Sequence, residues 1–247
     1  MSEVSQPLKP RSDLGVRTLS GIAMMAVAIA AISYGGWLFV ALIIGVGLAV
    51  YWEWVRLVNG FVFTTGKRAA WYLGGLIYVG LACFTLIVFG ATFFGMTPAI
   101  MLISGVIGTD IGAYFSGRSF GGPKIAPKIS PSKTWSGLFG GMIGAGAMMV
   151  LAQVVINLVR HENTEHWLYP VTTTLFVGAA MAVIAQAGDF FESWMKRRAG
   201  VKDSGNLIPG HGGFFDRVDG LIAVLFVSGL VPFVFYAYDC IRLGVLK

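Results

Sequence analysis

Long apolar runs constrain the fold of this 247-residue chain more than any other feature of its sequence. Seven runs, separated by short polar loops, cover residues 21–32, 37–54, 69–90, 97–114, 137–156, 167–186 and 219–238. Several of these runs have the length of about 20 residues that a helix needs to cross a bilayer. Only 12% of the residues are charged, against about 25% in soluble domains. The sequence therefore predicts an all-α, polytopic integral membrane protein.

The number of spans depends on whether the glycine pairs at 74–75 and 140–141 divide a run, so we expect seven to nine transmembrane helices. Residues 1–18 are polar and lack periodicity, which predicts a flexible cytosolic tail before a single transmembrane domain over residues 19–247. The first run also has the length of a secretory signal. A second apolar run begins at Trp37, however, and this favours a membrane helix.

The distribution of basic residues predicts the orientation in the membrane, because cytosolic loops are enriched in Lys and Arg. A cytosolic N-terminus places 15 of the 18 basic residues in cytosolic segments. They are Lys9, Arg11, Arg17, Arg56, Lys67, Arg68, Arg118, Lys124, Lys128, Lys133, Lys196, Arg197, Arg198, Lys202 and Arg217. Contact of this basic face with anionic membrane lipid then accounts for the net charge of +6, so no nucleic acid is expected as a partner.

The stretch from Ser193 to Asp219 concentrates ionisable side chains between two apolar runs. Asp216 and Asp219 are three residues apart, so on a helix they share one face and can hold a divalent cation. Proline and glycines before Asp216 predict a tight turn that presents N–H groups to an anion at the start of a helix. The turn residues are Pro209, Gly210, Gly212 and Gly213.

Basic side chains surround this predicted turn, and they come from Lys196, Arg197, Lys202 and Arg217. His211, inside the turn, can donate a hydrogen bond to a phosphate oxygen or relay a proton. The run 196–198 taken alone fits a topology signal or a lipid headgroup contact equally well. That alternative does not explain a glycine-rich turn beside paired acids, so the stretch predicts a site for phosphate and Mg²⁺.

Three further acids lie in an apolar run or shortly after one. Asp189, Ser193 and Lys196 fall at positions i, i+4 and i+7 of a helix, which places Asp189 where it can meet Asp216 and Asp219 around one cation. Glu192 can be a further ligand or a salt-bridge partner, and the sequence leaves both open. Asp110 lies within a span, where ionisable residues are usually functional, although a helix-packing role is the alternative.

The loop after Asp110 is the second basic stretch of the chain. Glycines 108, 112 and 117 allow another helix or a ligand to approach closely. Ser-Pro-Ser-Lys-Thr at 130–134 is typical of a phosphate-contacting turn, but it is not a Walker loop, since G-x-x-x-x-G-K-[ST] is absent. The candidate contacts are Arg118, Lys124, Lys128, Ser132, Lys133 and Thr134.

Both polar stretches resemble one enzyme family. The pattern S-x-x-K-R-x4-K-D-x4-I-P-G-H-G-G-F-x-D-R-x-D over 193–219 is similar to the motif of the phosphatidate cytidylyltransferases, or CDP-diacylglycerol synthases. D-I-G-A-Y-F-S-G-R-S-F-G and K-I-A-P-K-I-S-P-S-K-T-W-S-G within 110–141 resemble the same family. Ser136 departs from it, because many members carry an acid at that position.

The resemblance implies transfer of a cytidylyl group from CTP to phosphatidate, with Mg²⁺, in a catalytic domain at the cytosolic face of a bacterial inner membrane. It implies catalytic roles for Asp189, Lys202, His211, Asp216 and Arg217. The metal ligands expected are Asp189 and Asp216, then Asp219 and Asp110. Substrate contacts are expected from Arg118, Lys124, Ser132, Lys133, Thr134, Ser193, Lys196, Arg197, Pro209, Gly210, Gly212 and Gly213.

Two other functions compete with this interpretation. A CDP-alcohol phosphotransferase uses paired acids at the same surface, but its D-x2-D-G-x2-A-R-x8-G-x3-D-x3-D arrangement is missing. A transporter or lipid-binding scaffold would use buried acids as ion sites, but it would not need so many basic residues beside them. Glycine-rich spans also make a homodimer an expectation.

Overall fold

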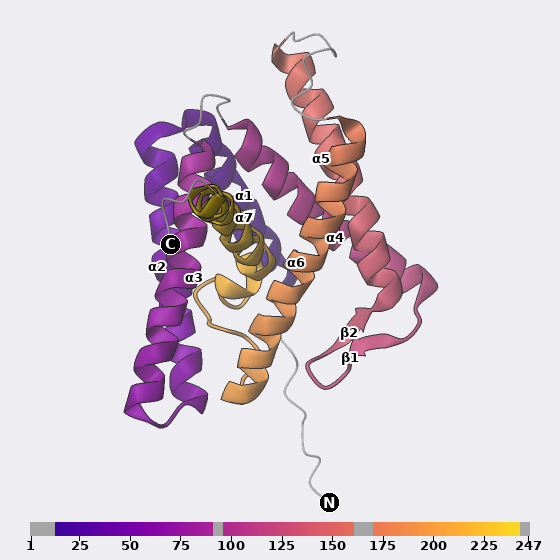
Figure 1. The fold of residues 1–247 in the computed structure, drawn as a ribbon. Coiled ribbons are helices and arrows are strands. Elements are labelled where there is room, and N and C mark those ends of the chain that lie inside the picture. The colour runs from indigo at the N-terminus through magenta and orange to yellow at the C-terminus, as the bar shows by residue number, and fades with distance from the viewer. Residues whose placement is uncertain (1–12, 91–95, 161–169, 243–247) are drawn as a thin grey trace, which may run out of the picture.

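Seven α-helices and one short β-hairpin make up the described part of the chain, which is the backbone of residues 13–90, 96–160 and 170–242 of a computed structural model (Figure 1). The helices are α1 (Asp13–Tyr34), α2 (Gly36–Phe61), α3 (Thr65–Gly90), α4 (Thr97–Phe120), α5 (Trp135–Arg160), α6 (Val171–Ala199) and α7 (Phe215–Arg242). The strands are β1 (Lys124–Ala126) and β2 (Ser130–Thr134).

Six helices among the described residues, α1 to α6, are long and apolar enough to cross a membrane. The predicted class of all-α membrane protein is therefore confirmed, while the count of seven to nine spans and the cytosolic N-terminus stay predictions. Helices α3 and α5 run unbroken through the glycine pairs at 74–75 and 140–141. Helix α1 begins at Asp13, before the predicted end of the tail, and residues 1–12 lie outside the described part.

The hairpin replaces the open loop that the sequence predicts after α4. Strands β1 and β2 are antiparallel, with Lys124 opposite Thr134 and Ala126 opposite Ser130. The Thr134 hydroxyl accepts a hydrogen bond of 3.1 Å from the N–H of Gly137, three residues on, as an N-cap of α5 does. The Ser136 hydroxyl donates to the carbonyl of Gly121, so Ser136 fastens the base of the hairpin.

Glycines allow α4 and α5 to cross at backbone contact. A Cβ on Gly108 would lie 2.4 Å from the carbonyl oxygen of Gly144, and a Cβ on Gly112 would lie 2.2 Å from that of Gly140. Neither distance leaves room for a side chain. The pairs 108/112 and 140/144 each repeat every four residues, so they form one smooth stripe on each helix. The close helix approach that the sequence predicts at Gly108 and Gly112 is therefore present.

Aromatic rings hold α2, α3, α6 and α7 together around Trp54, which is 3% exposed. Its ring centroid lies 6.0 Å from that of Trp71, 5.7 Å from Phe191 and 6.0 Å from Phe215. The indole N–H donates a hydrogen bond of 2.9 Å to the carbonyl of Trp71, so its polar atom is satisfied inside the core. Gly75 provides the space for this ring, because a Cβ there would lie 2.3 Å from the indole nitrogen.

The C-terminus of α6 is closed by Gly200, whose φ of 70° is left-handed. Val201 N–H bonds back to the carbonyl of Lys196, five residues earlier, at 3.0 Å, which is the six-to-one bond of a Schellman motif. The chain then turns into the loop that leads to α7. This loop, the hairpin and the connection between α2 and α3 all lie at the same end of the helices (Figure 1). Arg197 Nε donates to the carbonyl of Ile129 at 3.3 Å and joins the end of α6 to the hairpin.

The α4–α5 contact predicts that Gly112→Ala lowers the melting temperature in detergent. Overpacking of this kind costs about 1–3 kcal/mol, because the added methyl group meets the Gly140 carbonyl. Gly80→Ala is the matched control, since a Cβ on this α3 glycine meets nothing within 4 Å and alanine favours a helix. Equal melting temperatures for the two variants would contradict the close crossing.

Candidate active site

Three carboxylates form the centre of the site. Asp189 and Glu192 of α6 and Asp219 of α7 offer oxygen atoms that all lie within 4.8 Å of one another. The two helices approach closely here because Gly188 has no side chain. A Cβ at this position would lie 2.8 Å from the carbonyl oxygen of Asp219. The predicted meeting of Asp189 and Asp219 is thus present, and Glu192, which the sequence left open, joins them. Such a set of carboxylate oxygens suits Mg²⁺.

Two lysines neutralise part of this acidic cluster. Lys133 of β2 forms an ion pair with Asp189, and Lys196 Nζ lies 2.6 Å from Glu192 Oε2 and 2.7 Å from Asp216 Oδ1. Burial alone would lower the pKa of Lys133, but the charge of Asp189 and its hydrogen bond outweigh burial and raise that pKa above its ordinary value. Lys133 therefore remains a cation at neutral pH, beside a place where phosphate charge can bind.

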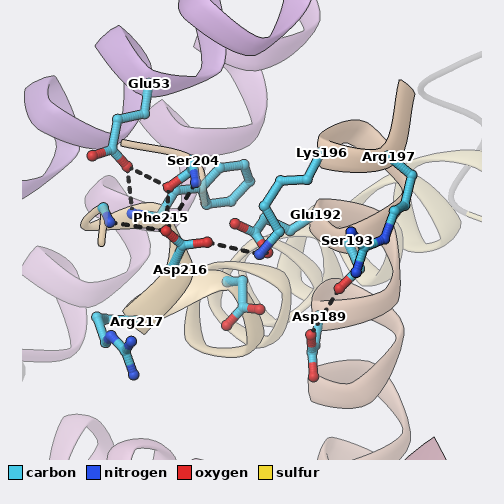
Figure 2. Close-up of polar contacts among 12 residues, drawn as sticks. Glu53, Asp189, Glu192, Ser193, Lys196, Arg197, Ser204, Phe215, Asp216 and Arg217 are labelled. Carbon is cyan, nitrogen blue, oxygen red and sulfur yellow. Dashed lines mark hydrogen bonds and ion pairs between the residues drawn. The ribbon is translucent and has the colours of Figure 1, made fainter. Parts of the chain in front are cut away.

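Asp216 lies outside the cluster of three and closes the loop between α6 and α7 (Figure 2). Its Oδ2 accepts hydrogen bonds from the N–H of Ser204 at 2.9 Å, the hydroxyl of Ser204 at 2.9 Å and the N–H of Gly213 at 2.8 Å. The predicted metal role of Asp216 is not tested by these contacts. They do give Asp216 a structural role that the sequence did not suggest.

Glu53 of α2 holds the loop beside the site, and the sequence analysis did not assign it a role. Its side chain is fully buried, and Figure 2 shows it reaching the loop from the opposite side to Asp216. Its carboxylate accepts hydrogen bonds from the N–H of Phe214 at 3.1 Å, the N–H of Phe215 at 2.8 Å and the hydroxyl of Ser204 at 2.8 Å. A single acid within an apolar run was the available signal, because an ionisable residue there is costly unless it is used.

The predicted tight turn is present at Ile208–His211. His211 N–H bonds to the carbonyl of Ile208 at 3.0 Å, and Gly210 has a φ of 76°. Pro209 at the second position and a glycine at positive φ at the third are typical of a type II turn. Gly213 needs a bare backbone for a different reason, since a Cβ there would lie 2.4 Å from Glu53 Oε2.

The turn is braced from both sides. Ser20 of α1 lies 2.8 Å from Nδ1 of His211, and its hydroxyl donates to the carbonyl of Pro209 at 3.0 Å. Arg217 donates to the carbonyl of His211 from Nη2 at 2.7 Å. Of the two residues predicted to be catalytic here, His211 is part of the turn and Arg217 contacts it. The contact with α1 was not predicted. Lys202, the remaining basic residue of the loop, is exposed to solvent.

A polar cavity of about 340 Å³ opens beside the cluster, between α4, β2, α5 and α6. Four predicted substrate contacts line it, namely Arg118, Ser132, Lys133 and Thr134. Asp110 also lines this cavity and does not belong to the cluster of three acids. Lys124 is exposed and donates to the carbonyl of Ser132 at 3.5 Å, and the Ser193 hydroxyl donates to Asp189 at 3.4 Å. The two motif stretches therefore meet. Their residues lie in three places, namely the carboxylate cluster, the turn at Ile208–His211 and the cavity.

Apolar helices that carry a carboxylate cluster beside basic loops define an integral membrane protein suited to phosphate chemistry at one membrane face. A model of the cytidylyltransferase family matches residues 62–235. A phosphatidate cytidylyltransferase of Brucella suis biovar 1 (strain 1330) is 34% identical, over 89% of this chain and 94% of its own length. That of Rickettsia typhi (strain ATCC VR-144 / Wilmington) is 36% identical, over 87% and 90%. The chain belongs to the cytidylyltransferase family.

The contacts of Glu53 predict that Glu53→Gln lowers the free energy of unfolding by about 1–3 kcal/mol, because an amide NH₂ would face at least one buried donor of the loop. It should also speed tryptic cleavage at Lys202. Asp203→Asn is the matched control, since it removes the same charge from an exposed side chain of the same loop. Unchanged melting and cleavage in Glu53→Gln would show that the loop does not depend on this carboxylate.

Proposed function

We propose that this chain catalyses transfer of the cytidylyl group of CTP to phosphatidate, giving CDP-diacylglycerol and pyrophosphate. The observation that carries the proposal is the carboxylate cluster of Asp189, Glu192 and Asp219 with Lys133 and Lys196 at its edges. The site lies at an end of apolar helices, where a water-soluble nucleotide and a membrane lipid can meet. Relatives that are named phosphatidate cytidylyltransferase support the choice of both substrates.

In the proposed reaction a phosphate oxygen of phosphatidate attacks the α-phosphorus of CTP. A new phosphorus–oxygen bond forms, the bond from the α-phosphorus to the bridging oxygen breaks, and pyrophosphate leaves with the electron pair. The attacking phosphate is ionised at neutral pH, so the reaction needs no strong general base. Positioning and charge neutralisation are then the main tasks of the protein.

The side chains of this site fit those tasks. Lys133 and Lys196 supply fixed positive charge within the cluster, and Lys202 adds an ammonium from the exposed loop. In the turn at 208–213 the N–H groups of Gly210 and Gly212 lie outside the hydrogen bonds that hold the turn, and such groups before a helix N-terminus can bind phosphate. Asp189, Glu192 and Asp219 would hold Mg²⁺. When bound, that ion would neutralise charge on phosphate oxygens.

Asp216 and Asp110 remain candidates for the metal on different grounds. Asp216 shares Lys196 with Glu192, so it stands next to the cluster, and a ligand role would require Lys196 to release it. Asp110 lies across the cavity that Lys133 also lines. A homodimer stays an expectation, but the glycines of α4 and α5 that motivated it are used for contact within the chain.

Two alternatives are separated from the proposal by one assay. Purified protein should release pyrophosphate from CTP only when phosphatidate is present. A CDP-alcohol phosphotransferase would release CMP from CDP-diacylglycerol and an alcohol, and a transporter or lipid scaffold would release neither product. Pyrophosphate release that is independent of phosphatidate would contradict the proposal that phosphatidate is the acceptor.

Charge removal at Asp189 predicts a loss of activity without a loss of stability. Asp189→Asn should lower kcat/KM by about 100-fold or more, by comparison with loss of one electrostatic group in an active site, and raise the Mg²⁺ concentration for half activity. Its melting temperature should be unchanged, because the ion pair with Lys133 and the hydrogen bond from Ser193 are lost while repulsion from Glu192 and Asp219 is relieved. Asp216→Asn is the contrast, since loss of its loop contacts should lower both activity and melting temperature.

A cytosolic site predicts the sidedness of thiol labelling in cells. Single cysteines at Ser132 or Asn206, both exposed, in a background lacking Cys83 and Cys240, should react with an impermeant reagent only after the cytosolic side is opened. A cysteine at Tyr34, which is the last residue of α1 and is 85% exposed, should react in intact cells. The reverse pattern would place the proposed active site outside.

A further inference from the structure

Gln186 is a buried side chain whose polar atoms are unused. It lies on α6 one turn before Asp189 and is 4% exposed. Neither its amide oxygen nor its amide nitrogen has a hydrogen-bond partner among the described residues. Gln153 provides the contrast, because it is equally buried and accepts a hydrogen bond of 3.1 Å from the hydroxyl of Thr174.

The side chain of Gln186 faces the polar cavity between α4, β2, α5 and α6. Leaving a buried amide without partners costs stability, so such groups are normally paired with protein, water or a ligand. The amide nitrogen packs closely against Gly141, because a Cβ there would lie 3.1 Å from Nε2 of Gln186. An amide that is held in place without internal partners is suited to pair with a molecule that enters the cavity.

The chemistry of the amide selects among molecules that can reach this site. Gln186 offers one acceptor and two N–H donors side by side. The ester oxygens of phosphatidate, and its phosphate oxygens when fully ionised, only accept hydrogen bonds, so they would leave the amide oxygen unpaired. A cytosine edge carries an amino donor next to a ring nitrogen that accepts, and this edge satisfies both halves of the amide.

The other cavity walls also suit a nucleoside. Tyr114 presents an aromatic ring on which a base can stack, and the Arg118 guanidinium carbon lies 6.0 Å from the centroid of that ring. The Asp110 carboxylate repels phosphate and can accept hydrogen bonds from sugar hydroxyls. The volume of about 340 Å³ is at the lower end of the about 300–1,000 Å³ of small-molecule sites.

Lys133 gives the cavity a direction. It lines the cavity and also pairs with Asp189 of the acidic cluster. A nucleotide with its base beside Gln186 would therefore extend its phosphates past Lys133 toward the cluster, where the proposed transfer takes place. The opposite direction would put phosphates beside Asp110.

We propose that this cavity binds the nucleoside part of CTP and that the amide of Gln186 hydrogen-bonds the edge of the base. The proposal rests on the proposed cytidylyltransferase activity and adds a nucleotide-recognition residue to it. Because an amide can rotate by half a turn, Gln186 contributes affinity for a base edge, and the remaining walls decide which pyrimidine is preferred.

The test replaces the amide and measures the two substrates separately. Gln186→Leu should raise the KM for CTP by about 10-fold or more, the scale of one two-point base contact, and leave the KM for phosphatidate within about two-fold. The stabilisation of the protein by added CTP, measured as a shift in melting temperature, should shrink in the same variant. Without ligand its melting temperature should equal or exceed that of the wild type, because an unpaired buried amide has been removed.

Gln153→Leu is the matched control, and it should leave the KM for CTP unchanged. Gln186→Met keeps an unbranched side chain and serves if the leucine variant does not fold. An increase in the KM for phosphatidate alone would overturn the proposal in favour of a headgroup site. A lower melting temperature with an unchanged KM for CTP would overturn it in favour of a packing role. Absence of turnover in the wild-type protein would instead refute the proposed function.

Discussion

The buried carboxylate of Glu53 is the interaction on which the rest of the site depends. A charge inside a membrane protein is costly unless hydrogen bonds satisfy it, and three donors of the loop between α6 and α7 do so. These bonds fix the first residues of α7, which places Asp219 opposite α6. The loop is bound from α2 by Glu53 and closed from within by Asp216, so its backbone has little freedom.

The acids around the site form two groups: one holds the loop between α6 and α7, and the other forms the carboxylate cluster. Glu53 and Asp216 bind backbone N–H groups and the hydroxyl of Ser204, whereas Asp189, Glu192 and Asp219 face one another. Carboxylates that repel one another are tolerated only where cations hold them, and the two lysines supply that charge without leaving the site. In the proposed reaction the same lysines would meet the phosphates of the nucleotide, so the free and the substrate-bound site would use the same neutralising groups.

Hydropathy located the helices well because a bilayer accepts few alternatives to an apolar helix. The meeting of Asp189 and Asp219 was also predictable, since each lies at the polar end of a run. The hydrogen bonds between Glu53 and a loop 151 residues away were not predictable, because no local pattern encodes a partner at that separation. Gln186 looked like an ordinary member of an apolar run, and only burial without a partner distinguishes it.

Helix α1 brings the membrane itself into the geometry of the turn. Only 6% of its apolar window is buried against protein, yet Ser20 contacts both Pro209 and His211. The position of α1 is therefore set largely by the lipid around it and only slightly by helix packing. One brace of the turn at Ile208–His211 would in this way be anchored in the lipid from which the proposed acceptor comes, and detergent that loosens α1 would loosen the turn with it.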